Sequence, residues 1–115
     1  MLAHEPLPMM YIPDCLTGTV NYLAAEHSQL KRNVYNVAGL SFSPDVLLKS
    51  IQRHYPKFNI TYEPTVAQKI AHSWPDSMDD SNARNDWGFR NEWNLDAMTD
   101  DMIKQVKELK ANGLL

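Results

Sequence analysis

The side chains that could do chemistry in this sequence are four histidines, two aspartate pairs, five tyrosines and a single cysteine. The histidines stand at positions with none of the spacings typical of a zinc site, and one cysteine cannot supply a pair of thiolates. We therefore expect no metal site, and we expect the histidines to be solvated or half-buried. They are His4, His27, His54 and His72.

The aspartate pairs, Asp79-Asp80 and Asp100-Asp101, could act as general acid and base or hold a cation. Both pairs occur at predicted helix starts, where carboxylates accept backbone N–H groups and meet the positive end of the helix dipole. We therefore interpret them as helix caps rather than as a catalytic pair.

Two signatures of a nucleotide-dependent oxidoreductase are missing from the sequence. The four glycines are too scattered to form a glycine-rich phosphate loop. No tyrosine is followed four residues later by a lysine, which is the pair by which many oxidoreductases activate a hydroxyl. Cys15 has no basic neighbour in sequence and is predicted to be a small buried hydrophobe in a helix rather than a nucleophile. The sequence predicts no catalytic and no cofactor-binding residue.

The composition limits the remaining classes of protein to which the chain could belong. The chain has 115 residues, enough for one domain, with 43% hydrophobic residues and a net charge of −3. It holds no apolar run of the roughly 20 residues that a bilayer helix needs, and its charge does not favour a nucleic-acid partner. The lone cysteine is compatible with a reducing compartment. The first residues resemble neither a signal peptide nor a transit peptide.

The stretch from Ser73 to Phe89 contains two of the three tryptophans. Because a proline disfavours helical angles for the residue before it, Ser73-Trp74-Pro75 is predicted to be extended. We call these three residues the Trp74 arm.

The rest of this stretch predicts a short helix. Asp79 is placed to cap it, with its carboxylate on the N–H of Ser81 or Asn82, and Gly88 to end it in a left-handed turn. Arg84 is expected to serve the helix end or an ion pair, and Trp87 to pack against the domain.

Strands and helices alternate along the chain, which favours a layered α/β arrangement. Apolar or alternating residues predict strands at 9–12, 33–38 and 58–62. Helical spacing predicts helices at 15–25, 44–55, 64–70 and 95–112, with caps at Asp14, Ser43 and Asn94 and a stop at Gly113. The buried stripe of the first of these helices is expected to be Leu16, Val20, Leu23 and Ala24.

Three stretches together closely resemble the L-threonine 3-dehydrogenases, which are extended short-chain dehydrogenases related to sugar-nucleotide epimerases. They are Pro8 to Leu16 (PMMYIPDCL), Tyr35 to Pro44 (YNVAGLSFSP), and the Trp74 arm with the following Asp79 to Gly88 (DDSNARNDWG). The family uses NAD to oxidise the β-hydroxyl of L-threonine to 2-amino-3-oxobutanoate. The resemblance covers nearly the whole chain and corresponds to the C-terminal part of those enzymes.

The resemblance implies a fold and a domain. Residues 1–115 would form a single, small, layered substrate-binding lobe of α/β class, with three short strands and about five helices. The Rossmann portion, with its glycine-rich loop and its tyrosine/lysine pair, would be largely absent. The chain would then be inactive alone and would bind no NAD. The alternative is a non-catalytic remnant or interaction module that associates with a full-length partner.

The resemblance also suggests a site. In the epimerase relatives the segment before the Asp-x-Ser-x-Ala helix contacts the substrate, and here that segment holds Ser73, Trp74 and Pro75. An aromatic wall suits a small amino acid, so Trp74 is predicted to close a threonine pocket, and the alternative is a core aromatic. Met10 and Tyr11, at the end of a predicted strand, are assigned to the core.

The compartment that the resemblance implies is the mitochondrion, with the cytoplasm as the alternative. Self-association or a dimer with a full-length homologue is expected, with neither a nucleic-acid nor a membrane partner.

Overall fold

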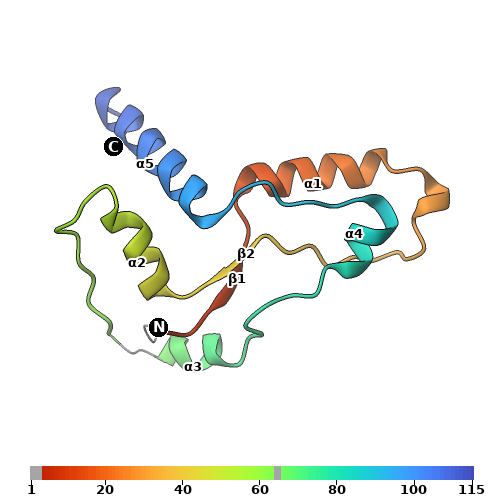
Figure 1. The fold of residues 1–115 in the computed structure, drawn as a ribbon, viewed down its shortest axis with the longest axis horizontal. Helices are drawn as coiled ribbons and strands as arrows, with labels where there is room; N and C mark the ends of the chain where they lie inside the picture. Colours follow the sequence, from red (N-terminus) through yellow and green to blue (C-terminus); the bar gives the residue numbers. More distant parts are fainter. Residues whose placement is uncertain (1–3, 64–65) are drawn as a thin grey trace.

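Two short strands lie at the centre of the computed structural model, which describes residues 4–63 and 66–115. β1 (Leu7–Met9) and β2 (Leu40–Phe42) pair antiparallel, with Leu7 opposite Phe42 and Met9 opposite Leu40. Figure 1 shows this ribbon in the middle, with α2 and α5 on one side, α1 and α4 on the other, and α3 near the N-terminus. Pro8 is tolerated in β1 because each strand of a two-stranded ribbon has a free edge.

The first helix, α1 (Ile12–Ala24), begins earlier than predicted. Tyr11 is its N-cap, Pro13 lies in its first turn, where a missing N–H costs nothing, and a short 3₁₀ helix, η1 (His27–Gln29), follows it. Asp14 is not the cap. Its carboxylate is buried and accepts the N–H groups of Glu92 and Trp93 at 2.8 and 3.2 Å. A short-range pattern cannot reveal this long-range bridge.

The other helices lie near their predicted positions, although the helix predicted at 44–55 ends at Gln52 and the predicted helix start at Pro64 lies outside the described residues. α2 (Pro44–Gln52) has Ser43 as N-cap, although the Ser43 side chain makes no capping hydrogen bond. α3 (Val66–His72) and α4 (Ser81–Trp87) follow, and α5 (Leu95–Ala111) is capped by Asn94, which accepts the Ala97 N–H at 2.8 Å. None of the described helices is both long and apolar enough to cross a bilayer.

Glycine ends both α4 and α5, as predicted. Gly88 has φ of 78° and Gly113 has φ of 69°, the left-handed region that favours glycine. After α5, the N–H of Leu114 reaches the carbonyl of Leu109 at 2.9 Å, which is the hydrogen bond of a Schellman cap.

The α/β class and the five helices are confirmed, but the strand predictions are wrong. The described residues form two strands where three were expected. The segment predicted at 9–12 is divided between the end of β1, two residues without regular structure and the start of α1, whereas 33–38 and 58–62 are unpaired. Alternation identifies a segment that could pair with a strand, but pairing also requires a neighbour. These two segments have none within the described part of the chain.

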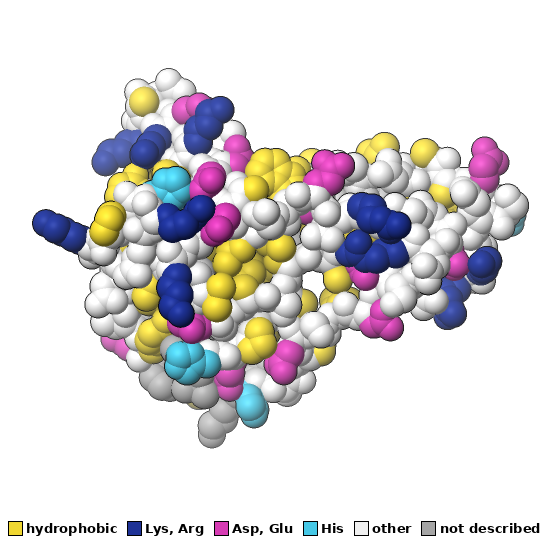
Figure 2. Space-filling model, viewed as in Figure 1, with side chains coloured by type: hydrophobic (Ala, Val, Ile, Leu, Met, Phe, Trp, Pro, Cys, Tyr) yellow, Lys and Arg dark blue, Asp and Glu magenta, His cyan; other side chains and the backbone are white. Residues whose placement is uncertain are grey.

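The core is small. Among the described residues, Leu7, Ala83, Phe89 and Met98 are the buried hydrophobic side chains. The predicted buried stripe of α1 is wrong, because Leu16, Val20 and Leu23 are 62%, 63% and 77% exposed and Ala24 is also exposed. Figure 2 shows hydrophobic side chains uncovered on this face, both over the middle of the molecule and along α1.

The overall dimensions agree with a thin core. The radius of gyration is 17.1 Å, against about 13 Å for a compact domain of this length. The accessible surface is 8358 Å², against about 6,400 Å² for a compact monomer of this mass. The fold therefore leaves faces open that a compact domain would cover.

Replacing Asp14 with alanine should lower the free energy of unfolding by about 3 kcal/mol, because two backbone N–H groups lose a charged acceptor in a buried place. Urea denaturation would measure this change. Asp14→Asn keeps one acceptor oxygen and should lose about half as much, whereas the exposed Asp76→Ala serves as control. An Asp14→Ala variant as stable as the parent would contradict the bridge.

The open face of α1 should make the chain self-associate, because apolar area exposed on one face is buried when copies meet. Sedimentation velocity should show concentration-dependent association that the double variant Leu16→Lys/Val20→Lys reduces. The control is Thr17→Lys/Asn21→Lys, which adds the same charges with the same spacing at exposed polar positions of α1. A monodisperse, cooperatively melting monomer would count against this prediction.

Candidate functional site

The Trp74 arm follows directly on α3. The Ser73 hydroxyl donates to the Ile70 carbonyl at 2.6 Å, and the Trp74 N–H donates to the Ala71 carbonyl at 3.0 Å. Ser73 and Trp74 therefore form the turn that ends α3, and the prediction of an extended arm is wrong for these two residues. The carbonyls at the end of the helix lack partners within it, and they capture the nearest donors.

Two contacts fasten this part of the chain to its N-terminal half. His72 Nδ1 lies 2.8 Å from Glu5 Oε1, and the Ser41 hydroxyl donates to the carbonyl of Asp76. The arm is therefore held beside the β1–β2 ribbon. The Trp74 side chain is 57% exposed, so Trp74 is not a core aromatic in this chain. Its ring is accessible to a ligand.

The α4 segment next to the arm is a scaffold. The Asp79 carboxylate accepts the Ser81 N–H at 2.9 Å, as predicted, although Asp80 is the N-cap residue by position. Arg84 Nε donates to Asp80 at 2.8 Å, which confirms the ion pair expected for Arg84. This hydrogen bond holds the pKa of Asp80 below its usual value, and Asp80 also accepts the Ala38 N–H at 3.3 Å.

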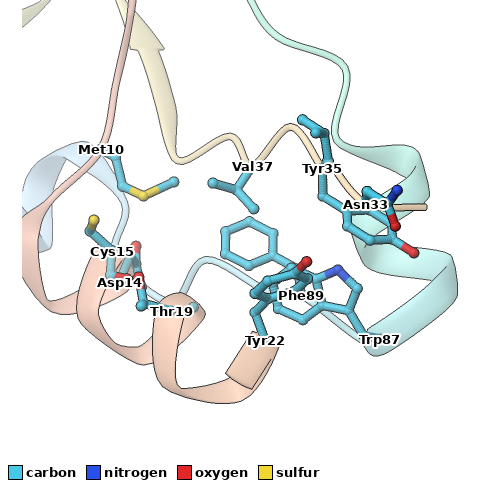
Figure 3. Close-up of a pocket in the computed structure, with 12 residues that line it drawn as sticks. Met10, Asp14, Cys15, Thr19, Tyr22, Asn33, Tyr35, Val37, Trp87 and Phe89 are labelled. Carbon is cyan, nitrogen blue, oxygen red and sulfur yellow. Dashed lines mark hydrogen bonds between the residues drawn. The ribbon is translucent and has the colours of Figure 1, made fainter. Parts of the chain in front are cut away.

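A cavity of about 320 Å³ opens between α1 and the segment 33–37. Figure 3 shows side chains from both elements and from the end of α4 pointing into it. Its lining is mostly apolar and aromatic: Met10, Asp14, Cys15, Gly18, Thr19, Tyr22, Asn33, Val34, Tyr35, Val37, Trp87 and Phe89. A space of this size and character would hold a small apolar or aromatic group.

Four aromatic rings form one wall of this cavity. The Trp87 ring lies 5.5 Å from Tyr22, 6.1 Å from Tyr35 and 5.7 Å from Phe89, measured between centroids. These edge-on and tilted contacts confirm the packing role predicted for Trp87. The Trp87 indole Nε1 is buried with no hydrogen-bond partner in the described part of the chain.

Tyr35 is one of the two tyrosines of this wall, and it has a hydrogen-bond partner on α4. Burial raises the pKa of its phenol, and the hydrogen bond from Tyr35 to Asp86 at 2.9 Å raises the pKa further. A phenol held protonated in this way is a hydrogen-bond donor rather than a base. Sequence reasoning missed this contact because the two residues are 51 positions apart.

Tyr11 packs as predicted, whereas Cys15 does not. The Tyr11 hydroxyl donates to Asp101 at 2.6 Å, and its ring meets Trp93 edge-on at 5.0 Å, so Tyr11 joins α1 to α5, in agreement with its core assignment. The hydrogen bond to Asp101 raises the pKa of Tyr11. Cys15 is exposed, and the prediction that it is buried is wrong because its face of α1 is uncovered.

Three of the histidines contact carboxylates across the fold. His4 lies 3.1 Å from Asp45, and His54 lies 2.6 Å from Asp100, which Arg53 also contacts at 2.7 Å. With the His72 contact described above, these pairs tie neighbouring elements together. No group of three or more possible metal ligands gathers in residues 4–63 and 66–115.

A second hollow of about 290 Å³ lies between α2 and α5 and is almost wholly apolar. Leu47 and Ile51 of α2 face Met98 and Met102 of α5 across it. The apolar sides of α2 and α5 meet here, although Met102 and Val106 are about half exposed.

Known proteins are similar to this chain in sequence and in fold. No protein-family profile matches the chain. The "L-threonine 3-dehydrogenase, mitochondrial" of Bos taurus is 41% identical over 98 residues, which are 84% of this chain and 26% of the bovine protein. An uncharacterised epimerase/dehydratase of Staphylococcus haemolyticus is 39% identical over 108 residues, 92% of this chain and 34% of that protein.

A solved structure agrees with these relatives. The L-threonine 3-dehydrogenase of Trypanosoma brucei is 48% identical, with a TM-score of 0.90 over 95% of this chain and 34% of its own. The chain therefore spans between a quarter and a third of the length of the relatives that it matches. The resemblance found in the sequence is confirmed over this part.

In the Asp80→Asn variant the free energy of unfolding should fall less steeply than in the parent as the pH is lowered. The pKa of Asp80 is lower in the folded state than in the unfolded state. The contribution of Asp80 to the free energy of unfolding is therefore fully present above the ordinary aspartate pKa of about 3.9, and it is lost as the pH falls through the lower folded pKa. Between pH 6 and pH 2 the parent should lose about 1 kcal/mol more than the variant in urea denaturation. Asp76→Asn, an exposed carboxylate on the same segment, is the control. Equal acid slopes for parent and Asp80→Asn would contradict this prediction.

Proposed function

We propose, from the premise that this chain belongs to the L-threonine 3-dehydrogenase family, that it forms the C-terminal substrate-binding lobe of such an enzyme. The parent reaction would be the NAD-dependent oxidation of L-threonine to 2-amino-3-oxobutanoate. The observation that carries the proposal is the match to the T. brucei enzyme, in sequence and in fold, over 95% of this chain.

The Trp74 arm would supply one wall of the threonine pocket. The exposed Trp74 ring offers an apolar surface for the substrate methyl group, and Pro75 fixes the chain beside it. The Ser73 hydroxyl donates to a backbone carbonyl but keeps lone pairs that can accept from the substrate ammonium. In this proposal the arm binds and orients threonine, and it takes no part in hydride transfer.

The described residues do not fit the pyrophosphate of NAD. Such a site needs glycine in the turn that leads into a helix N-terminus. The glycines with positive φ here, Gly88 and Gly113, come after the ends of α4 and α5 instead. We therefore propose that the chain alone holds no NAD and catalyses no oxidation.

The alternative function is a non-catalytic module that associates with a full-length homologue. The uncovered faces of α1 and of the α2–α5 hollow support it, because they offer apolar area to a partner. Dehydrogenase activity can be measured for a full-length homologue alone and for its mixture with this chain. A change in activity in the mixture would support the module, whereas equal activities would support a substrate lobe that acts only within one chain.

For the compartment we propose the mitochondrion, following the name of the bovine relative. The cytoplasm is the alternative, because a bacterial relative matches the chain to a similar extent.

The direct test is to mix the chain with L-threonine and NAD and to follow NADH absorbance and, by calorimetry, threonine binding. We expect no turnover but measurable threonine binding, which Trp74→Ala should weaken about tenfold, or about 1.4 kcal/mol. Phe58→Ala, which truncates another partly exposed aromatic ring, should leave binding unchanged. Turnover by the chain alone would refute the proposal that it is catalytically incomplete. Threonine binding by Trp74→Ala as tight as that of the parent would refute the proposal that Trp74 forms a wall of the pocket.

A further inference from the structure

The helix α3, which leads into the Trp74 arm, is held only weakly by packing. Its apolar residues Val66 and Ile70 are 77% and 58% exposed, and the Trp74 ring that follows is 57% exposed. Figure 1 shows α3 at the edge of the molecule, beside the N-terminus. A segment that buries little apolar area gains little from the hydrophobic effect, so polar contacts decide where it lies.

Two polar contacts fix the arm, one on each side of it, and both reach the same ribbon. Before the arm, His72 Nδ1 lies 2.8 Å from Glu5 Oε1, and Glu5 stands two residues ahead of β1. After the arm, the carbonyl of Asp76 accepts the Ser41 hydroxyl, and Ser41 is the central residue of β2. Trp74 lies midway between these contacts in the sequence. We call the Glu5–His72 contact the clamp.

The two contacts respond differently to pH. Between pH 5 and 8 a histidine side chain exchanges a positive charge for a neutral ring, whereas a hydroxyl and a backbone carbonyl keep their state. The clamp is thus an ion pair at the acidic end of this range and a weaker contact between a neutral ring and a carboxylate at the other end. The His72 side chain is 76% exposed, so protons reach it freely.

The charges that bear on the clamp come from the N-terminal segment. Within the described part of the chain, Glu5 is the charged group that contacts the His72 ring, and its side chain is 24% exposed. The neighbouring His4 faces Asp45 of α2 at 3.1 Å instead. His4 is therefore a second titratable group on this segment, and a test has to separate its effect from that of His72.

We propose that Glu5 and His72 are positioning residues for the Trp74 arm, and that they hold Trp74 beside the β1–β2 ribbon chiefly while His72 is protonated. An arm that is already held in place loses less conformational entropy when a ligand binds. Threonine should therefore bind more tightly at pH 5.5 than at pH 7.5. The inference rests on the proposed function for the identity of this ligand, whereas the clamp itself does not.

The test is the backbone order parameter of the Trp74 amide, from ¹⁵N relaxation of the 115-residue chain at pH 5.5 and pH 7.5. In the parent it should fall from about 0.85, the value of a rigid backbone, towards about 0.6, that of a flexible one. Glu5→Gln should give the low value at both pH values. His72→Lys, which stays positively charged over this range, should give the high value at both.

Two variants serve as controls. His4→Gln should keep the pH-dependent fall, because His4 contacts a different carboxylate. Ser41→Ala removes the second contact, so it should lower the order parameter at both pH values and leave the fall itself in place. The amide of Ala83 is the internal reference, since Ala83 is a fully buried residue of α4.

Threonine affinity is measured by calorimetry at the same two pH values. The parent should bind about threefold more tightly at pH 5.5 than at pH 7.5, the effect expected of one exposed ion pair, and Glu5→Gln should lose this difference. Titration of threonine itself affects both proteins alike, so the comparison between them isolates the clamp.

Three outcomes would overturn the proposal. The Trp74 order parameter would not change with pH in the parent, or it would change equally in Glu5→Gln. The fall would disappear in His4→Gln, which would assign the pH response to the other histidine. The parent would bind threonine equally well at both pH values although its arm loses order. A pH-dependent order parameter without any threonine binding would support the clamp and refute the proposed function.

Discussion

The ring of Phe89 lies so close to Gly18 that the rest of the fold on that side depends on this contact. A Cβ atom built on Gly18 would stand 2.9 Å from the Phe89 ring, and the ring itself is 1% exposed. Phe89 follows the left-handed residue Gly88, so the turn that ends α4 aims the ring at α1. Through this ring α1, α4 and the aromatic wall of the cavity are held together. Any side chain at position 18 would force either the Phe89 ring or α1 to move.

Elsewhere polar bridges connect elements that a larger core would hold by packing. Asp14 connects α1 to the segment before α5, and Tyr11 connects the same helix to α5 through Asp101. His54 and Arg53 connect the end of α2 to Asp100. Exposed bridges of this kind contribute little each, whereas the buried carboxylate of Asp14 contributes more. The fold therefore depends on a few specific hydrogen bonds more than a compact domain would.

Local signals were sufficient for most ends of helices, although not for the start of α1, and they were insufficient for the faces of helices. The Asn94 cap, the proline at the start of α2 and the glycines after α4 and α5 act within a few residues, and all were predicted. The stripe of α1 was assigned to the core because a pattern shows which face is apolar but not whether anything covers it. The strands at 33–38 and 58–62 failed for the same reason. For the candidate site, the sequence indicated Trp74 but not its exposure, and it could not indicate the Tyr35–Asp86 contact, which depends on the fold.

The large accessible surface has a thermal consequence. The heat-capacity change of unfolding arises from the hydration of surface that the folded state keeps from water, and apolar area dominates it. A compact domain of this length would show about 1.5 kcal/mol/K. This chain already exposes its α1 stripe when folded, so less apolar area remains to be hydrated. The free energy of unfolding therefore depends less strongly on temperature than it does in a compact domain. Covering the open faces would increase both this free energy and its curvature with temperature.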